Sequence, residues 1–434
     1  MKKFLLAISL LAVLASACRN PQPAPPMAPP LPDMSPEVLE DRLLGALVGS
    51  AIGDAMGAPT EMWPRFRIQA EFGHVDSLDH QVRGPSPEGV WGYNLPAGGT
   101  TDDTRWKALL IDFIAGTQEN PQPRPDSLSA AALAQLLLDR YQLGIREMQE
   151  APSPDADQLE DGLQRVLWLK EWASVAEAYQ SGDIDAYGLA LNKFYGGEMV
   201  CGGMLFAPVI GMAYPGAPEY AYEQAFNLNI YDIGYGRDIG ALTASMVSVA
   251  MVPGADGKDL REVLREVDPR GYFRSRLVGR SSYELFRRAL DIAEMARTTD
   301  PEQPLEQLAV RLAMPIDSLE MRQRYVQWAV AYEALDQQLF RMAFHPGELW
   351  LIMWTAMLVC DYDFRQTLAF IINYGRDNDT SGAVAGAILG AMYGAEALPA
   401  DLVEPTLEAN LELGLDLREM AGRMVKALLA TPEV

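Results

Sequence analysis

Residues 45–57 read GALVGSAIGDAMG, and residues 382–394 read GAVAGAILGAMYG. Both segments place glycine at every fourth position of an otherwise apolar, helical pattern. Glycine inside a helix costs about 0.5–1 kcal/mol relative to alanine, so four in one helix need a compensating contact. We therefore predict two helices whose glycine faces are closely approached by another helix or by a ligand.

A small-residue repeat is also typical of membrane helices. Here Asp54 and Glu61 flank the first repeat, and no run of about 20 apolar residues surrounds it. We therefore interpret the repeat as part of a buried helix in a soluble body.

Helical periodicity continues through most of the chain. Ser35 is a suitable N-cap, and Pro36 suits the first helical position. Almost no segment alternates with a period of two, so the sequence predicts an all-α fold. The expected helices cover residues 35–57, 104–116, 127–143, 158–180, 283–297, 317–341, 346–360 and 404–430. Residues 63–99, rich in glycine, proline and aromatic residues, are expected to form a long ordered loop.

Two clusters of acidic and hydroxyl residues each open a predicted helix. Residues 101–104 read TDDT, and residues 377–380 read DNDT. Helix N-termini favour carboxylates, so capping alone would explain one such cluster. A calcium loop starting at Asp377 would need a glutamate at position twelve, where the chain has Ile388. Two oxygen-rich clusters brought together by the fold would instead suit a hard divalent cation such as Mg²⁺ or Mn²⁺.

The charge of the chain limits its partners. Its 434 residues carry a formal charge of −24, with 49% hydrophobic residues. Such a chain is expected to repel nucleic acid and anionic membranes, because it has no run of lysine or arginine. The chain has only three histidines, at positions 74, 80 and 345, which disfavours a histidine metal centre. Three cysteines cannot form a disulfide framework.

The first residues predict export and a lipid anchor. Residues 1–17 have a basic start and an apolar core, and Cys18 follows a stretch that resembles a bacterial lipoprotein cleavage site. Residues 18–36 are rich in proline and predict an extended tether. The expected location is the bacterial cell envelope, on the outer membrane or a periplasmic face, with membrane contact only through a lipid on Cys18.

One further pattern is an internal repeat. Residues 235–238 and residues 374–377 both read YGRD, and each precedes a helix of small residues. The repeat is compatible with a duplicated helix pair or with a chance match of four residues.

Three motifs together resemble those of the ADP-ribosylglycohydrolase family, which includes the dinitrogenase-reductase-activating glycohydrolase. They are GDAMG at residues 53–57 followed by Glu61, TDDT at residues 101–104, and Asp-x-Asp-Thr at residues 377–380. Their order and spacing fit the family, and the resemblance extends over most of residues 40–395. It implies that residues 37–434 form one compact all-α domain with two Mg²⁺ or Mn²⁺ ions between its helices.

The resemblance also implies site residues. Glu61 corresponds to an acidic residue that stands over the metals, and we expect Glu61 and Asp103 to be the catalytic carboxylates. Asp379 is the candidate to bridge the ions, whereas Asp54 is expected to hold backbone near the site. The implied metal ligands are Thr101, Asp102, Asp103, Asp377, Asp379 and Thr380.

The substrate half of the motif set departs from the family. Where the family often has Asn-Gly and then Met-Arg, residues 200–206 read VCGGMLF, and Tyr235 stands near a position that is often histidine. Gly202 and Gly203 are expected to offer N–H groups to a diphosphate, and Tyr235 to stack on a base. These departures favour hydrolysis at a metal-bound ribose over ADP-ribose itself as the substrate.

The family cleaves N- or O-glycosidic bonds at the distal ribose of ADP-ribose, so an ADP-ribosylated or related small molecule is the expected substrate. Two alternatives remain: a non-catalytic ligand-binding or structural member of the same scaffold, and a two-metal phosphohydrolase. The sequence does not choose between oligomeric states.

Overall fold

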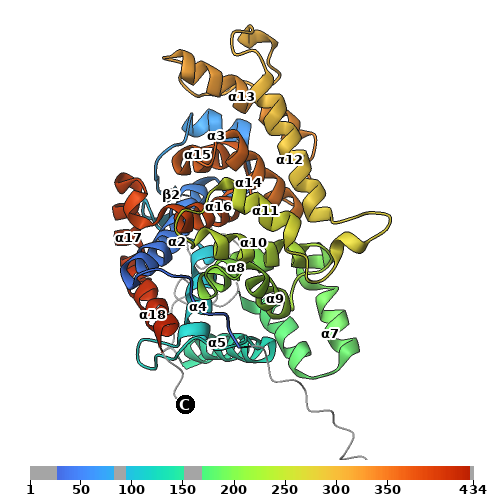
Figure 1. The fold of residues 1–434 in the computed structure, drawn as a ribbon, viewed down its shortest axis with the longest axis vertical. Helices are drawn as coiled ribbons and strands as arrows, with labels where there is room; N and C mark the ends of the chain where they lie inside the picture. Colours follow the sequence, from blue (N-terminus) through green and yellow to red (C-terminus); the bar gives the residue numbers. More distant parts are fainter. Residues whose placement is uncertain (1–26, 83–93, 151–168, 431–434) are drawn as a thin grey trace, which may run out of the picture.

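The computed structural model describes residues 27–82, 94–150 and 169–430 (Figure 1). The predicted signal peptide, Cys18 and the first part of the predicted tether lie outside the described residues. Within the described residues the fold is helical, and the strands are only two residues long. The prediction of an all-α fold is confirmed. None of the described helices combines the length and apolar character needed to span a bilayer.

The elements are given in chain order. Residues 151–168, between α5 and α7, lie outside the described residues, and residues 169–180 that follow them are helical. The α-helices are α2 (Pro36–Gly57), α3 (Arg65–Phe72), α4 (Asp102–Ala115), α5 (Ala130–Glu150), α7 (Ile184–Leu191), α8 (Gly202–Ala213), α9 (Pro218–Leu228), α10 (Gly236–Ala250), α11 (Gly257–Glu266), α12 (Ser281–Thr298), α13 (Leu319–Asp336), α14 (Pro346–Val359), α15 (Phe364–Tyr374), α16 (Asn378–Tyr393), α17 (Ala400–Glu412) and α18 (Leu417–Leu429). The short 3₁₀ helices are η1 (Ala58–Thr60), η2 (Phe194–Gly197), η3 (Tyr272–Arg274), η4 (Leu305–Gln307) and η5 (Ala395–Ala397). The strands pair as β1 (Trp63–Pro64) with β4 (Gly375–Arg376), and β2 (Gln81–Val82) with β3 (Asn94–Leu95).

Helices α2 and α16 form the centre of the molecule and make the most extensive contact between any two elements (Figure 1). A Cβ atom on any of the facing glycines would come closer than 3.0 Å to the backbone of its partner helix. The predicted close approach is therefore between these two helices. Because the partner numbers fall as the α2 numbers rise, the helices run antiparallel. The facing pairs are Gly45 with Gly390, Gly49 with Gly386, and Gly53 with Gly382.

This packing has a direct consequence for the site. The C-terminal end of α2 lies beside the N-terminal end of α16, where a Cβ on Gly57 would overlap the backbone of Asp379. The first helix begins as predicted, with the Ser35 hydroxyl accepting a hydrogen bond from the Val38 N–H at 3.3 Å. The GDAMG motif at residues 53–57 therefore lies next to the acidic cluster at residues 377–380.

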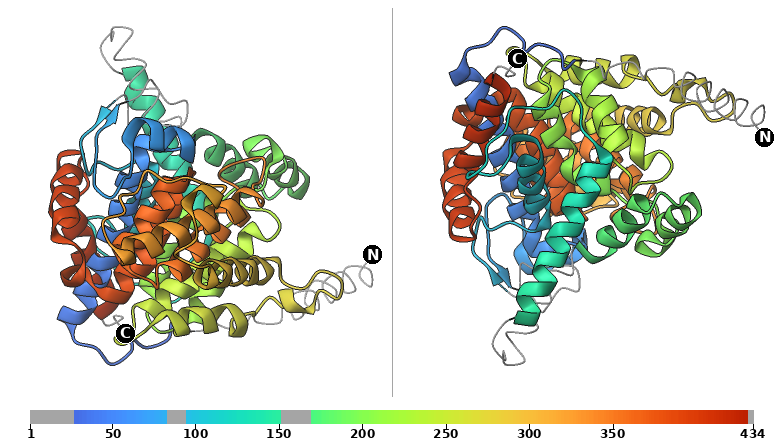
Figure 2. Two further views of the ribbon diagram at one scale, coloured as in Figure 1. Left: turned by 90° about the horizontal axis from the view of Figure 1, so that it is seen from above. Right: turned by 90° about the horizontal axis from the view of Figure 1, so that it is seen from below.

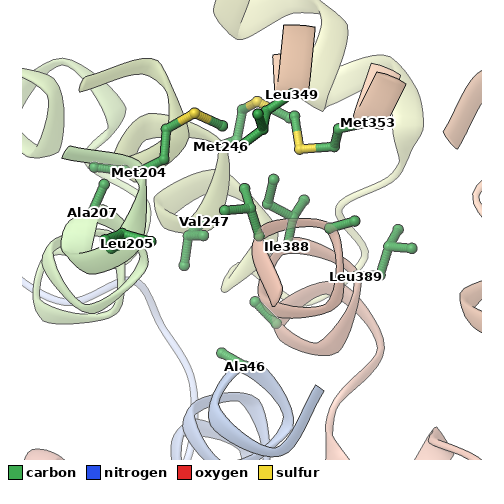
Figure 3. Close-up of a cluster of buried hydrophobic side chains, with 14 of the residues drawn as sticks. Ala46, Met204, Leu205, Ala207, Met246, Val247, Leu349, Met353, Ile388 and Leu389 are labelled. Carbon is green, nitrogen blue, oxygen red and sulfur yellow. The ribbon is translucent and has the colours of Figure 1, made fainter. Parts of the chain in front are cut away.

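A methionine-rich core joins five helices. Figure 3 shows Met204 and Met246 near Met353, with Ile388 and Ala46 below them. These residues come from α8, α10, α14, α16 and α2, and all are buried. Flexible thioether side chains suit a junction where several helices meet at different angles. The core thus fixes α8 against the central pair, which matters because α8 begins at the site.

Helices α17 and α18 lie along the outer side of α2 in both views of Figure 2. The sequence predicted one helix over residues 404–430, and that prediction is wrong. The chain turns at Gly414, whose φ of +83° is accessible mainly to glycine, and α18 starts afresh with Asp416 as its N-cap.

The predicted loop over residues 63–99 also needs correction. Its described part contains β1, α3 and the strand pair β2–β3, and residues 83–93 lie outside the described residues. Helix α3 is short and mostly exposed, so it lacked the apolar stripe by which a helix is recognised.

The described part of the predicted tether lies against the body. The Ala28 N–H donates to Asp126 Oδ1 at 3.0 Å, and Arg124 donates to the Pro29 carbonyl at 3.2 Å. Residues 27–34 are therefore packed along the surface rather than extended away from it. Arg124 also donates to the Ala213 carbonyl at 2.9 Å, which ties the segment to the end of α8.

Candidate metal centre

The two acidic clusters meet. The Thr380 hydroxyl, in the first turn of α16, donates to Asp103 Oδ2, in the first turn of α4, at 3.0 Å. These residues are 277 positions apart in the chain, so the fold brings together what the sequence separates. The predicted convergence of the clusters is therefore present in the structure.

Asp54 holds the start of α4 from another helix. Its Oδ1 accepts the Thr101 N–H at 3.0 Å and the Thr101 hydroxyl at 2.9 Å. Its Oδ2 accepts the Thr104 N–H at 3.1 Å and the Thr104 hydroxyl at 2.6 Å. Asp54 thereby satisfies backbone donors that the N-terminus of a helix leaves unpaired. As expected, Asp54 binds backbone near the site. Its four hydrogen bonds attach the turn at residues 101–104 to α2.

Glu61 is fixed by contacts with the segment that precedes Asp377. The Met62 N–H donates to the Arg376 carbonyl at 2.7 Å, and Trp63 pairs with Arg376 between β1 and β4. On its other side, the Asn378 amide donates to the Thr60 hydroxyl at 2.8 Å. Glu61 is therefore held between two contacts to the start of α16.

One cavity contains most of the predicted site residues. Glu61, Asp102, Asp103, Asp377, Asp379, Thr380 and Gly202 all line it. Three predicted residues are not among its lining residues. Thr101 is fully buried, and its hydroxyl donates to Asp54 Oδ1.

The other two are Gly203 and Tyr235. The Gly203 N–H donates to Asp232 Oδ2 at 2.8 Å, so this donor is already used within the protein. Tyr235 is half-buried at the N-cap of α10, where its ring lies 5.9 Å from that of His345. Substrate contact by Gly203 or Tyr235 stays a prediction.

The cavity is strongly acidic, and burial governs its carboxyl groups. Burial raises the pKa of Asp103 to about 7 and the pKa of Asp377 to about 8, from an ordinary value of 3.8. It also raises the pKa values of Asp102 and Asp379, with repulsion from neighbouring carboxylates acting in the same direction. A buried cation, Lys107, lies 3.6 Å from Asp103 Oδ1 and lowers the pKa of Asp103 in part. Arg105 likewise lowers the pKa of Asp102, so two basic side chains act on a cavity lined by four aspartates and Glu61.

The oxygen set fits a hard divalent cation. Asp103 Oδ1 and Asp379 Oδ1 are buried, and neither has a hydrogen-bond partner. Such atoms are rare unless an ion, a water or a ligand completes them. As they stand, the described side chains include no group of three or more histidine, cysteine or acidic residues set to hold a metal ion. A divalent cation bound between these carboxylates would offset their repulsion and let them approach one another, and the threonine hydroxyls could add further oxygen ligands.

The cavity also has an apolar part of its wall, most of which the sequence analysis did not predict. Its residues are Met62, Trp172, Tyr195, Val200, Cys201, Leu205 and Phe344. Val200, Cys201 and Leu205 belong to the VCGGMLF stretch at residues 200–206, whereas Met62, Trp172, Tyr195 and Phe344 come from separate segments, so only the fold reveals these four. Cys201 is buried, and its sulfur lies 3.9 Å from Asp377 Oδ2 and lines the cavity.

The YGRD repeat does not produce two equivalent sites. Asp377 is the N-cap of α16 and lines the cavity. Asp238 lies within the first turn of α10, where Arg280 Nη2 donates to it at 2.7 Å in a fully buried ion pair. The two segments therefore start their helices in different registers, which favours a chance match over a duplication.

A sequence profile described as ADP-ribosylglycohydrolase matches residues 35–433. The chain belongs to the ADP-ribosylglycohydrolase family. Its fold is similar to that of a solved structure described as an "ADP-ribosylglycohydrolase-related protein complex", with a TM-score of 0.52 and 18% sequence identity over 91% of this chain and 100% of that one. At this identity the likeness concerns the fold alone. No curated protein matches the sequence.

Family membership confirms the resemblance drawn from the three motifs. It supports a glycohydrolase that acts on ADP-ribosyl-type substrates. In this ADP-ribosylglycohydrolase family member, Glu61 and residues of both acidic clusters line one cavity, whereas Gly203 and Tyr235 are not among its lining residues.

Proposed function

We propose that this family member is a metal-dependent hydrolase that cleaves an N- or O-glycosidic bond at the ribose of an ADP-ribosylated or related ribosyl substrate. The observation that carries the proposal is the meeting of the two acidic clusters, marked by the bond of 3.0 Å between Thr380 and Asp103. A merely structural pair of helix caps would not need to share one cavity with Glu61.

Six residues would hold two Mg²⁺ or Mn²⁺ ions. Asp379 is central among them because its unpartnered oxygen is buried in the cavity and its helix start touches Gly57. When bound, the ions would orient the ribose hydroxyls and a water molecule and offset the negative charge of the cluster. The proposed ligands are Thr101, Asp102, Asp103, Asp377, Asp379 and Thr380.

Glu61 and Asp103 are the carboxylates that can move protons. Asp103 lies at the junction of the clusters, where it can accept a proton from the attacking water. Glu61 is held at the edge of the cavity by its flanking contacts. From there it can protonate the leaving atom or stabilise positive charge at the anomeric carbon.

The apolar wall would bind the part of the substrate that is not sugar. Tyr195 and Phe344 pack edge to face, with ring centroids 5.8 Å apart, and both line the cavity. Trp172 lies deeper, with its ring 5.2 Å from that of Phe194. Such a wall excludes water from the acidic side and can contact a planar group.

We further propose that the enzyme acts in the bacterial cell envelope, attached through a lipid on Cys18. The proposal rests on the lipoprotein-type sequence at residues 1–18. Scavenging of nucleotides or glycosides outside the cytoplasm would suit this location.

The test is hydrolysis of peptides that carry ADP-ribose on arginine, an N-glycoside, or on serine, an O-glycoside, in the presence of Mg²⁺. We expect release of free ADP-ribose. Asp379→Ala should abolish the release while leaving the fold intact, because it removes a proposed ligand from a cluster that is under electrostatic strain. Asp185→Ala, on the exposed helix α7, is the matched control and should retain activity.

Two results would contradict the proposal. Release of inorganic phosphate from phosphate esters instead of ADP-ribose would indicate a two-metal phosphohydrolase. Turnover by Asp379→Ala equal to that of the unmodified enzyme would remove the role given to this residue.

A further inference from the structure

Arg376 directly precedes Asp377, and its backbone is unusual. Its φ is +68°, in the left-handed region that residues other than glycine rarely occupy. An unfavourable backbone conformation persists where surrounding contacts hold it in place. Contacts of Arg376 with its surroundings must therefore hold this conformation in place.

The Arg376 side chain binds a buried carboxylate at both oxygens. Its Nε donates to Glu348 Oε1 at 2.6 Å, and its Nη2 donates to Glu348 Oε2 at 3.1 Å. The Glu348 side chain, in the first turn of α14, is only 3% exposed. A fork-like pair of this kind fixes the orientation of the guanidinium as well as its position.

The same guanidinium also reaches the loop before α14. Arg376 Nη2 donates to the Phe340 carbonyl at 2.9 Å, and the Phe340 N–H donates to Glu348 Oε2 at 2.7 Å. This closed set of bonds holds the loop that leads to Phe344 in the cavity wall. Arg376 therefore connects the acidic side of the cavity to its apolar side.

The backbone of Arg376 supports the catalytic side. Its carbonyl accepts the Met62 N–H at 2.7 Å, next to Glu61, and its own peptide leads directly into Asp377. The backbone pairing of β1 with β4 and the ion pair to Glu348 thus act on the same left-handed residue. Without the guanidinium, Glu61 and Asp377 would lose a shared support.

We propose that Arg376 is a positioning residue that fixes Glu61 relative to Asp377 through its carbonyl and its ion pair with Glu348. The inference rests on the proposed function, because it assigns Arg376 a role in the same site. Arg376 does not line the cavity, so it acts through the residues that it holds.

The experiment compares Arg376→Gly, Arg376→Lys and Glu348→Gln with the unmodified full chain. Glycine accepts the left-handed backbone, so Arg376→Gly removes the guanidinium without forcing a new turn. Three readouts are measured: hydrogen exchange in residues 61–64, where Glu61, Met62 and Trp63 carry the backbone N–H groups, Mn²⁺ affinity by electron paramagnetic resonance, and kcat with KM for ADP-ribosyl peptides.

We expect faster exchange at residues 61–64 in Arg376→Gly and Mn²⁺ binding weakened about 10–100-fold, the usual effect of losing a support behind a metal ligand. The loss should fall on kcat more than on KM, and Arg376→Lys should restore part of it. Glu348→Gln should change all readouts in the same direction, and it decides the question if Arg376→Gly does not fold.

Arg423→Ala is the matched control. Arg423 Nη1 donates to Asp112 Oδ1 at 2.8 Å in a half-buried pair outside the cavity. Its loss should lower thermal stability but leave Mn²⁺ affinity and exchange at residues 61–64 unchanged.

The outcomes separate the two proposals. Unchanged exchange at residues 61–64 in both Arg376→Gly and Glu348→Gln would overturn the positioning role. If the unmodified chain neither bound Mn²⁺ nor hydrolysed the peptides, the proposed function would fail, while the exchange measurement would still decide what Arg376 holds.

Discussion

At the scale of single residues, the acidic cavity is a source of instability that an ion would remove. Asp103 and Asp379 each bury an oxygen that has no hydrogen-bond partner. Burial raises the pKa of every aspartate that lines the cavity. A group whose pKa is higher in the folded than in the unfolded protein destabilises the fold once it must ionise. The metal-free protein should therefore respond to pH in a defined direction.

We predict that the free energy of unfolding of the chelated protein falls as pH rises from 5 to 8.5. The sign follows from the folded pKa values of about 7 for Asp103 and about 8 for Asp377, which lie above the ordinary 3.8, so the folded state binds more protons across this window. Mg²⁺ should raise the melting temperature more at pH 8 than at pH 5.5, because only the ionised cluster binds it well.

Thermal melting at both pH values, with excess EDTA or excess Mg²⁺, checks this prediction. Asp379→Asn is the control and should show a smaller response to both pH and Mg²⁺. Melting curves that are identical with EDTA and with Mg²⁺ at both pH values would contradict it.

At the scale of elements, the antiparallel contact of α2 and α16 places the site. Asp54 at the end of α2 binds the first turn of α4, and Gly57 allows the first turn of α16 to approach. The short pairing of β1 with β4 adds Glu61 to the same place. The adjoining ends of α2, α4 and α16 are thus fixed around one cavity by contacts between mostly buried residues.

We predict that Gly49→Ala destabilises the fold by about 1–3 kcal/mol, the usual cost of forcing extra atoms into a packed interior. The added methyl would come closer than 3.0 Å to the backbone of Gly386, so the two helices would have to separate. Mg²⁺ affinity should fall as well, although Gly49 lies more than a helical turn from Asp54.

Gly422→Ala is the control because it makes the same substitution inside α18, where nothing lies within 4 Å of the new methyl. It should stabilise the protein by about 0.5–1 kcal/mol through helix propensity. Chemical denaturation of both variants measures the difference. Equal effects of the two substitutions would show that the glycine contact does not matter for stability.

At the scale of the whole molecule, the sequence was informative where one motif carried both structure and chemistry. The glycine spacing at residues 45–57 predicted a close helix contact, and the clusters at residues 101–104 and 377–380 predicted a shared site. Both predictions depended on local spacing, which a single sequence displays. Glu61 and five residues of the two clusters therefore line one cavity: Asp102, Asp103, Asp377, Asp379 and Thr380.

The remaining features depend on tertiary contacts that no local pattern encodes. Asp232 takes the Gly203 N–H that was expected to face a diphosphate, and it approaches from a loop 29 residues further along the chain. Tyr195 and Phe344 reach the cavity from two unrelated segments. The turn at Gly414 interrupted an apolar pattern that was continuous in the sequence. Each of these features depends on how α8, α14 or α18 packs against the rest of the protein, and a local sequence pattern does not show that packing.

The central claim is that two distant segments of this chain hold divalent cations between them. The most direct measurement is a crystal structure of the full chain soaked with Mn²⁺, with anomalous diffraction used to locate the ion. The account predicts anomalous peaks in the cavity, between the turn at residues 101–104 and the turn at residues 377–380, and their loss in Asp379→Ala. A cavity without anomalous density at saturating Mn²⁺, or density only elsewhere on the protein, would contradict it.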